Sequence, residues 1–133
     1  MQFVELPSAG WDEDVYCEFP TARTDSSLFA NPAERYDVIL AIRHTEEYPY
    51  RDLYLNVESN PQAQLPKEVH LTLAGNSGKW TGKGLYGLYT VTDTLARDIP
   101  LPALLNASVG QNMRRGNIPG IVNVGLIIQR SKP

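Results

Sequence analysis

Apolar residues alternate with polar ones along much of this chain, and this period of two constrains the fold more than any other feature. Residues 15–19, 36–45, 53–58 and 69–73 each place most of their apolar side chains on one face of an extended run. Alternation of this kind predicts strands that are buried on one side. Ten prolines and ten glycines separate the runs and disfavour long helices.

Residues 121–130 are apolar in both phases, as in a central strand that is covered on both faces. Together these runs predict an all-β fold, a single antiparallel β-sandwich of the jelly-roll kind with about seven or eight strands. Less regular strands are expected at 85–94 and 104–109, loops at 20–33 and 74–84, and a short helical turn at 31–35.

A length of 133 residues suits one domain with one core, and we expect a single domain over residues 1–133. The net charge of −3 hides an asymmetry, because residues 1–68 hold 13 acids and 5 bases whereas residues 69–133 hold 2 acids and 7 bases. An antiparallel fold interleaves the two halves, so a charged surface forms only if the basic positions converge in space. The sequence pI near 5.3 disfavours nucleic acid as a partner.

Cys17 falls on the apolar face of its run and is predicted to be a buried core thiol. His44 shares the phase of the apolar face of 36–45, which is typical of a core or rim histidine. His70 falls on the outer face of its own run. Two such histidines do not form a metal site, and we expect neither a metal nor a cofactor.

The motifs of serine hydrolases and zinc proteases, Gly-x-Ser-x-Gly and His-Glu-x-x-His, do not occur in the sequence. The glycine-rich loop at 75–84 also departs from a phosphate-binding loop. Three residues separate Gly78 from Gly82, and Gly84 stands after Lys83 where such a loop has Ser or Thr. We therefore predict that the protein is not an enzyme.

Four segments have amino-acid sequences more specific than packing alone usually requires. They are residues 6–11, 43–55, 78–84 and 113–125. In these segments, and over nearly its whole length, the chain resembles the gliding-motility lipoproteins called GldH, from the envelope of Bacteroidetes-type bacteria. The resemblance implies a non-enzymatic protein that supports gliding motility and the associated secretion machinery through contacts with envelope proteins. It supplies no catalytic residues to transfer.

The resemblance also implies a lipid anchor on an acylated cysteine, placing the protein in the cell envelope and facing the periplasm or the cell surface. No basic and then apolar segment precedes Cys17, so Cys17 is not the lipid site. We expect the signal segment and the lipidated cysteine to be absent from these 133 residues.

Trp80 lies between Lys79 and Lys83 and has two interpretations. It packs beneath its loop as a plug on the end of the sandwich, or it forms an exposed aromatic platform, flanked by cations, for a glycan or for a partner's carboxylates. The second interpretation, with Tyr86 and Tyr89 added, is the basis of an alternative function, a glycan-binding β-sandwich. Coplanar, exposed rings would favour it.

Arg114 and Arg115 precede a turn, and they would gather with Lys79 and Lys83 if one end of the sandwich carried all four. Such a cluster would suit lipid headgroup phosphates or an acidic partner, whereas isolated charges would be solvated or paired within the chain. Tyrosines on both sides of Pro49 form a contact surface or brace their loop. The candidate contact residues are Lys79, Trp80, Lys83, Tyr86, Arg114, Arg115, Tyr48 and Tyr50.

Overall fold

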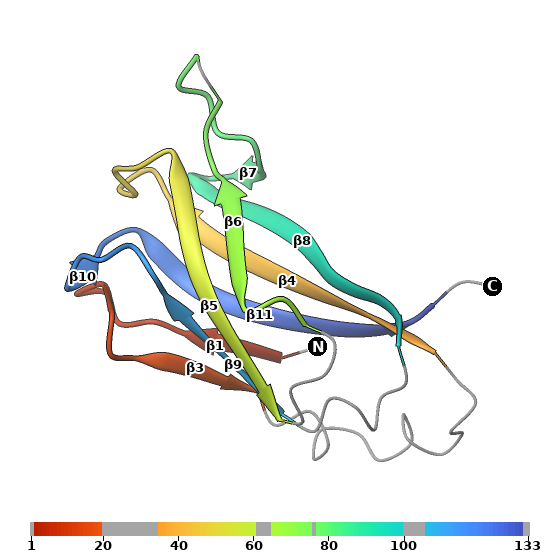
Figure 1. Cartoon of the computed structure of the whole chain (residues 1–133). Helices are drawn as coiled ribbons and strands as arrows, with labels where there is room; N and C mark the ends of the chain where they lie inside the picture. Colours follow the sequence, from red (N-terminus) through yellow and green to blue (C-terminus); the bar gives the residue numbers. More distant parts are fainter. Residues whose placement is uncertain (1, 20–34, 61–64, 76, 100–105, 132–133) are drawn as a thin grey trace.

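The structure is a computed structural model that describes residues 2–19, 35–60, 65–75, 77–99 and 106–131 (Figure 1). The described residues form eleven strands and no helix. The strands are β1 (Gln2–Glu5), β2 (Trp11–Asp12), β3 (Tyr16–Phe19), β4 (Tyr36–Thr45), β5 (Asp52–Asn60), β6 (Glu68–Thr72), β7 (Lys83–Leu85), β8 (Leu88–Ile99), β9 (Asn106–Gln111), β10 (Asn117–Ile118) and β11 (Ile121–Arg130).

Two antiparallel sheets pack face to face (Figure 1). The five-stranded sheet has the order β1-β11-β4-β8-β7, and the four-stranded sheet has the order β3-β9-β5-β6. This arrangement confirms the predicted all-β antiparallel sandwich. The predicted number of strands was too low, because β1, β2, β7 and β10 contain only two to four residues each and are too short to show a period.

The core lies between the two sheets and is built from the alternating apolar positions. On β4 these are Val38, Leu40 and Ile42, each fully buried. Burying one such side chain contributes about 1.5–3 kcal/mol. Cys17 is buried on β3 as predicted, and this burial raises the pKa of its thiol to about 11.

A two-stranded sheet of β2 and β10 closes one end of the sandwich. It pairs Trp11 with Ile118, and both side chains are fully buried. The amide of Gln111 donates hydrogen bonds to the backbone oxygens of Trp11 at 3.2 Å and Arg115 at 3.0 Å. Two of the distinctive sequence segments, 6–11 and 113–125, are therefore parts of one end of the molecule.

β4 and β11 have the predicted bounds of 36–45 and 121–130. β11 lies between β1 and β4 as a central strand should, and the Phe3 ring covers Gly125. The segment 74–84 is not wholly a loop, because Ala74 bridges Trp80 and β7 begins at Lys83. The predicted loop at 20–33 lies outside the described residues, as do most of the helical turn at 31–35 and the start of the strand at 104–109.

Candidate functional site

An aromatic cluster surrounds His44 near the end of β4. The imidazole is fully buried, and its ring centroid lies 4.8 Å from that of Trp80, 5.5 Å from that of Tyr89 and 6.1 Å from that of Tyr48. Nδ1 lies 3.1 Å from the Thr45 carbonyl oxygen, to which it donates, while Nε2 has no hydrogen-bond partner. Burial lowers the pKa of His44, as expected for a core histidine kept neutral.

Tyr48 is part of this cluster rather than of the surface, so its prediction as a contact residue was wrong. Only 2% of Tyr48 is exposed, and its hydroxyl donates a 2.6 Å hydrogen bond to the Asp52 carbonyl oxygen. The residue braces its loop. Tyr50 packs edge-on against it at 5.6 Å, and the Arg115 guanidinium lies 5.1 Å from the Tyr50 ring.

Trp80 is half-buried and packs against the hydrophobic core, which supports its interpretation as a plug. Its ring is tilted by 39° from that of Tyr89, so the coplanar platform required for the glycan-binding alternative is not formed at this loop. The Tyr89 hydroxyl donates a 3.1 Å hydrogen bond to Glu46. Tyr86 stands apart, at the tip of the hairpin that joins β7 to β8.

That tip carries the two most exposed large apolar side chains among the described residues, Tyr86 with 98% exposure and Leu85 with 72%. Leu88, with 37% exposure, lies beside them. Tyr86 and Gly87 form the two-residue turn between the strands and have φ values of 54° and 77°. Positive φ at both positions is the geometry of a type I′ turn, in which Asn and Gly are favoured and tyrosine is unusual.

Two cations flank this tip. Arg43 and Lys83 line an open hollow of about 580 Å³ together with Leu85, Tyr86 and Leu88. The Arg43 guanidinium also lies 4.3 Å from the centroid of the Phe3 ring on β1. We call Arg43, Lys83, Leu85, Tyr86 and Leu88 the hairpin-tip surface.

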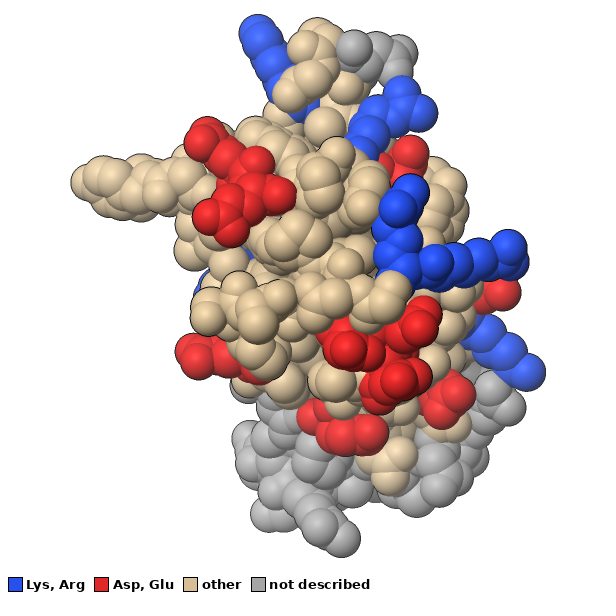
Figure 2. Space-filling view, turned by 90° about the vertical axis from the view of Figure 1, so that its left-hand side faces the viewer, with Lys and Arg blue, Asp and Glu red and all other residues tan. Residues whose placement is uncertain are grey.

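The four predicted cations do not form one cluster. Lys83 lines the hollow at the β7 edge of the five-stranded sheet, whereas Arg114 lines a different hollow with Tyr54 and Met113, beside the four-stranded sheet. In the face shown in Figure 2, Lys and Arg side chains lie chiefly toward the top and right, and Asp and Glu side chains lie chiefly across the middle and lower part. Lys79 and Arg115 are exposed.

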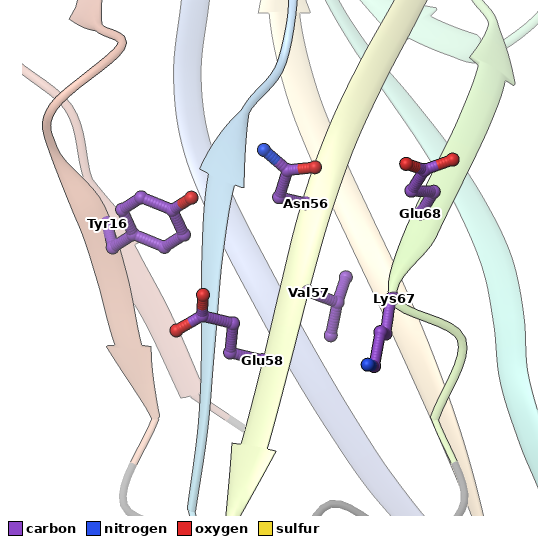
Figure 3. Close-up of a pocket in the computed structure, with 6 residues that line it drawn as sticks. All are labelled: Tyr16, Asn56, Val57, Glu58, Lys67 and Glu68. Atoms are coloured by element: carbon purple, nitrogen blue, oxygen red, sulfur yellow. The ribbon is translucent and has the colours of Figure 1, made fainter.

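A third hollow, of about 320 Å³, lies on the outer face of the four-stranded sheet (Figure 3). We call it the sheet groove. Its lining residues are Tyr16, Asn56, Val57, Glu58, Lys67 and Glu68. The sequence does not predict this site. Alternation places Tyr16, Asn56 and Glu58 on outer faces, but it does not reveal which strands are neighbours.

His70 lies on the outer face of the same sheet, as predicted. Its Nε2 is 2.8 Å from Asp52 Oδ1, and its ring stacks on Tyr54 with centroids 4.6 Å apart. The hydrogen bond from His70 is the main reason that the pKa of Asp52 is lowered. Within the described part of the chain, no three His, Cys, Asp or Glu side chains group so as to hold a metal ion, and no helix is long and apolar enough to cross a membrane.

The model of the GldH lipoprotein family matches residues 1–128. The chain belongs to the GldH lipoprotein family. This confirms the resemblance seen in the sequence, and membership in a lipoprotein family implies an envelope protein anchored to a membrane. A comparison with curated proteins gives no match.

Two solved structures of the coat protein of Tobacco streak virus are similar to this GldH family member. One, in a C2 crystal form, has a TM-score of 0.40 at 12% identity and covers 99% of this chain and 86% of its own. The other, a coat protein dimer, has a TM-score of 0.37 at 10% identity. The match covers 99% of this chain and 87% of the coat protein chain. Such low scores say nothing about what this chain binds.

Proposed function

We propose that this domain is the non-enzymatic part of an envelope lipoprotein that supports gliding motility and the associated secretion machinery through contacts with other envelope proteins. Membership in the GldH family supports the context. One structural observation supports the mode of action, namely the apolar tip of the β7–β8 hairpin, which projects three large side chains into solvent.

Single exposed apolar residues are normal on protein surfaces, whereas a contiguous exposed set marks an interaction site. Leu85, Tyr86 and Leu88 form such a set within four residues of sequence. Tyrosine is also enriched at protein interfaces, because a large rigid ring gains contact area at little cost in conformational entropy. The hairpin-tip surface therefore suits insertion into a pocket of a partner protein.

The backbone at the tip supports the same conclusion. A φ of 54° costs a residue such as Tyr86 about 1–2 kcal/mol relative to right-handed conformations. Glycine or asparagine would satisfy this turn better, so the tyrosine does not serve the stability of the hairpin. Strained positions of this kind cluster at binding sites.

The flanking charges indicate the chemistry of the partner. Arg43 and Lys83 are both cations, and they line the same hollow as Tyr86. We propose that the partner presents an apolar socket with carboxylates at its rim. Complementary charges of this kind chiefly raise the association rate and exclude wrong partners.

The test uses the full-length lipidated protein in its own cells. A photo-crosslinking amino acid, p-benzoylphenylalanine, replaces Tyr86 in one strain and Tyr54 in a control strain. Tyr54 is also an exposed tyrosine, with 45% exposure, but it lies on the opposite sheet. Tyr86→Asn and Leu85→Ser/Leu88→Ser variants are tested in parallel for gliding on agar and for secretion.

We expect one envelope protein to crosslink at position 86 and not at position 54, and we expect the tip variants to lose gliding while the protein remains folded and anchored. Normal gliding and secretion by both tip variants would show that this surface is not the contact. Digestion of the domain by added protease in intact cells would identify the surface-facing orientation, and protection until the outer membrane is opened would identify the periplasmic one.

A further inference from the structure

The sheet groove is a second site on the opposite sheet, unrelated to the hairpin-tip surface. Three of its lining residues, Tyr16, Asn56 and Glu68, belong to one row of residues that face each other across four strands. Tyr16 on β3 pairs with Gly110 on β9, Gly110 with Asn56 on β5, and Asn56 with Glu68 on β6. Three strand spacings give this row a length of about 14 Å.

An aromatic ring lies flat over the backbone at one end of the row. A Cβ atom built on Gly110 would lie 2.6–2.8 Å from three atoms of the Tyr16 ring, Cζ, Cε1 and Cε2. Similar distances to the three atoms mean that the ring turns one face to the sheet. The other face of this half-buried ring borders the groove.

Polar groups of several kinds line the groove between this ring and β6: Asn56 and Glu58 lie on the side of the ring, and Lys67 and Glu68 lie across β5 from it (Figure 3). The polar groups are the Tyr16 hydroxyl, the Asn56 amide, the Glu58 and Glu68 carboxylates and the Lys67 ammonium. Among the described residues, none of these five side chains forms a hydrogen bond or an ion pair. Both donors and acceptors are therefore free for a ligand.

The charges and shape decide the class of ligand. Two carboxylates and one ammonium leave the groove with a net charge of −1, which disfavours phosphates, acidic sugars and nucleic acid. Carboxylates and amides instead accept and donate hydrogen bonds to neutral hydroxyls, and an aromatic face packs against the C–H face of a pyranose ring.

We propose that the sheet groove binds a neutral saccharide, with one sugar ring on Tyr16 whose hydroxyl groups are hydrogen-bonded by Asn56 and Glu58, and with the next sugar along the row hydrogen-bonded by Glu68. The hollow of about 320 Å³ falls at the lower end of the usual range for ligand sites, roughly 300–1,000 Å³. Its open, shallow form suits a segment of one or two sugars within a longer chain.

The whole 133-residue chain, labelled with ¹⁵N, is titrated with neutral tetrasaccharides: cellotetraose, xylotetraose, laminaritetraose, mannotetraose and N-acetylchitotetraose. Tetragalacturonic acid serves as the acidic counterpart. We expect at least one neutral probe to shift the backbone amide of Gly110 and the side-chain amide of Asn56. Tyr16→Ala and Asn56→Ala should each weaken that binding about tenfold, whereas Tyr86→Ala, at the distant hairpin tip, should leave it unchanged.

Amide spectra of the variants establish that each is folded. The proposal is overturned if no neutral probe shifts Gly110 at 10 mM, or if the affinity survives in folded Tyr16→Ala. It is also overturned if the acidic tetrasaccharide binds more tightly than every neutral one, because the groove would then select charge rather than hydroxyl groups.

Discussion

His44 shows how much a single buried polar atom decides in this molecule. Its Nε2 lies in an aromatic environment with no hydrogen-bond partner, which typically costs about 1–3 kcal/mol. The gain is the packing of three aromatic rings around one imidazole, which attaches the loop of Trp80 to the end of β4. The price of this arrangement is a dependence on pH.

Burial lowers the pKa of His44 in the folded protein below its ordinary value of 6.5. As pH falls below about 6.5 the unfolded chain binds a proton first, so the free energy of unfolding decreases until the pH reaches the folded-state pKa. The loss is at most about 1.4 kcal/mol per pH unit. Above this window the contribution of neutral His44 is fully present.

His44→Phe should remove this dependence. At pH 8 we expect the free energies of unfolding of wild type and variant to agree within about 1 kcal/mol. The variant loses one stabilising hydrogen bond but also one destabilising unpaired nitrogen. At pH 5 the variant should be the more stable one. Urea unfolding at both pH values measures the difference, and every other titratable group cancels between the two chains. A difference that does not change with pH would contradict the burial of a neutral imidazole.

At the scale of elements, the β7–β8 hairpin combines a stable pairing with an unfavourable turn residue. Because Gly84 has no side chain, the Tyr89 ring can lie across β7. A Cβ atom at Gly84 would be only 2.3 Å from that ring. The turn then places Tyr86 at positive φ. The stability of the turn therefore favours glycine or asparagine at position 86, whereas the proposed contact with a partner favours tyrosine.

Tyr86→Asn should raise the free energy of unfolding by about 0.5–1 kcal/mol, because asparagine tolerates positive φ in this turn. Tyr86→Val should lower it, since a β-branched side chain tolerates that conformation least. Thermal unfolding of the two variants checks the order. If Tyr86→Asn were the less stable chain, the ring would be contributing to the fold, and its assignment to a partner would lose its main support.

The turn between β10 and β11 is the second element under strict geometric control. Gly120 has a φ of 89°, and a Cβ there would lie 2.3 Å from the backbone nitrogen of Tyr48. Its carbonyl also accepts a 2.8 Å hydrogen bond from the Thr45 amide. Packing and turn geometry thus explain part of the distinctive sequence of residues 113–125.

Gly120→Ala should lower the free energy of unfolding by about 3 kcal/mol. The causes are backbone strain at positive φ and a clash with backbone atoms that no rotamer change relieves. The matched control is Gly116→Ala in the same segment, where no atom lies within 4 Å of an added Cβ. We expect the control to change stability by less than about 0.5 kcal/mol. Equal effects of the two changes in urea unfolding would mean that Gly120 is not held as the structure shows.

At the scale of the whole molecule, the two sheets share one core and draw strands from both halves of the chain. β4 lies between β11 and β8, and β5 lies between β9 and β6. The acidic first half and the basic second half are consequently interleaved. Figure 2 shows one face of the molecule that carries charged side chains of both signs.

A shared core predicts that residues 1–133 unfold as one cooperative unit. Trp80→Phe leaves Trp11 as the remaining tryptophan of the two, and its fluorescence reports the end closed by β2 and β10. Far-UV circular dichroism reports both sheets. The two urea transitions should coincide, with a slope of about 1–3 kcal/mol per molar. Separate midpoints would contradict the expectation of a single domain.

The sequence by itself determined which face the longer alternating strands bury. A period of two places Cys17 and His44 inside and His70 outside without reference to any neighbour, and the structure confirms all three. The sequence also indicated the family, because the family's sequence motifs are short and local. These properties depend on residues a few positions apart.

Only the tertiary structure decided which surfaces meet. Alternation placed Tyr16 and Asn56 on outer faces, but the row that joins them through Gly110 depends on pairing between residues that are 54 and 94 positions apart. The local sequence left Tyr48 either in a contact surface or bracing its loop, and contacts with His44 and Asp52 decide for bracing. Periodicity fixes the direction of a side chain, whereas its neighbours are fixed by the pairing of distant strands, which no local pattern encodes.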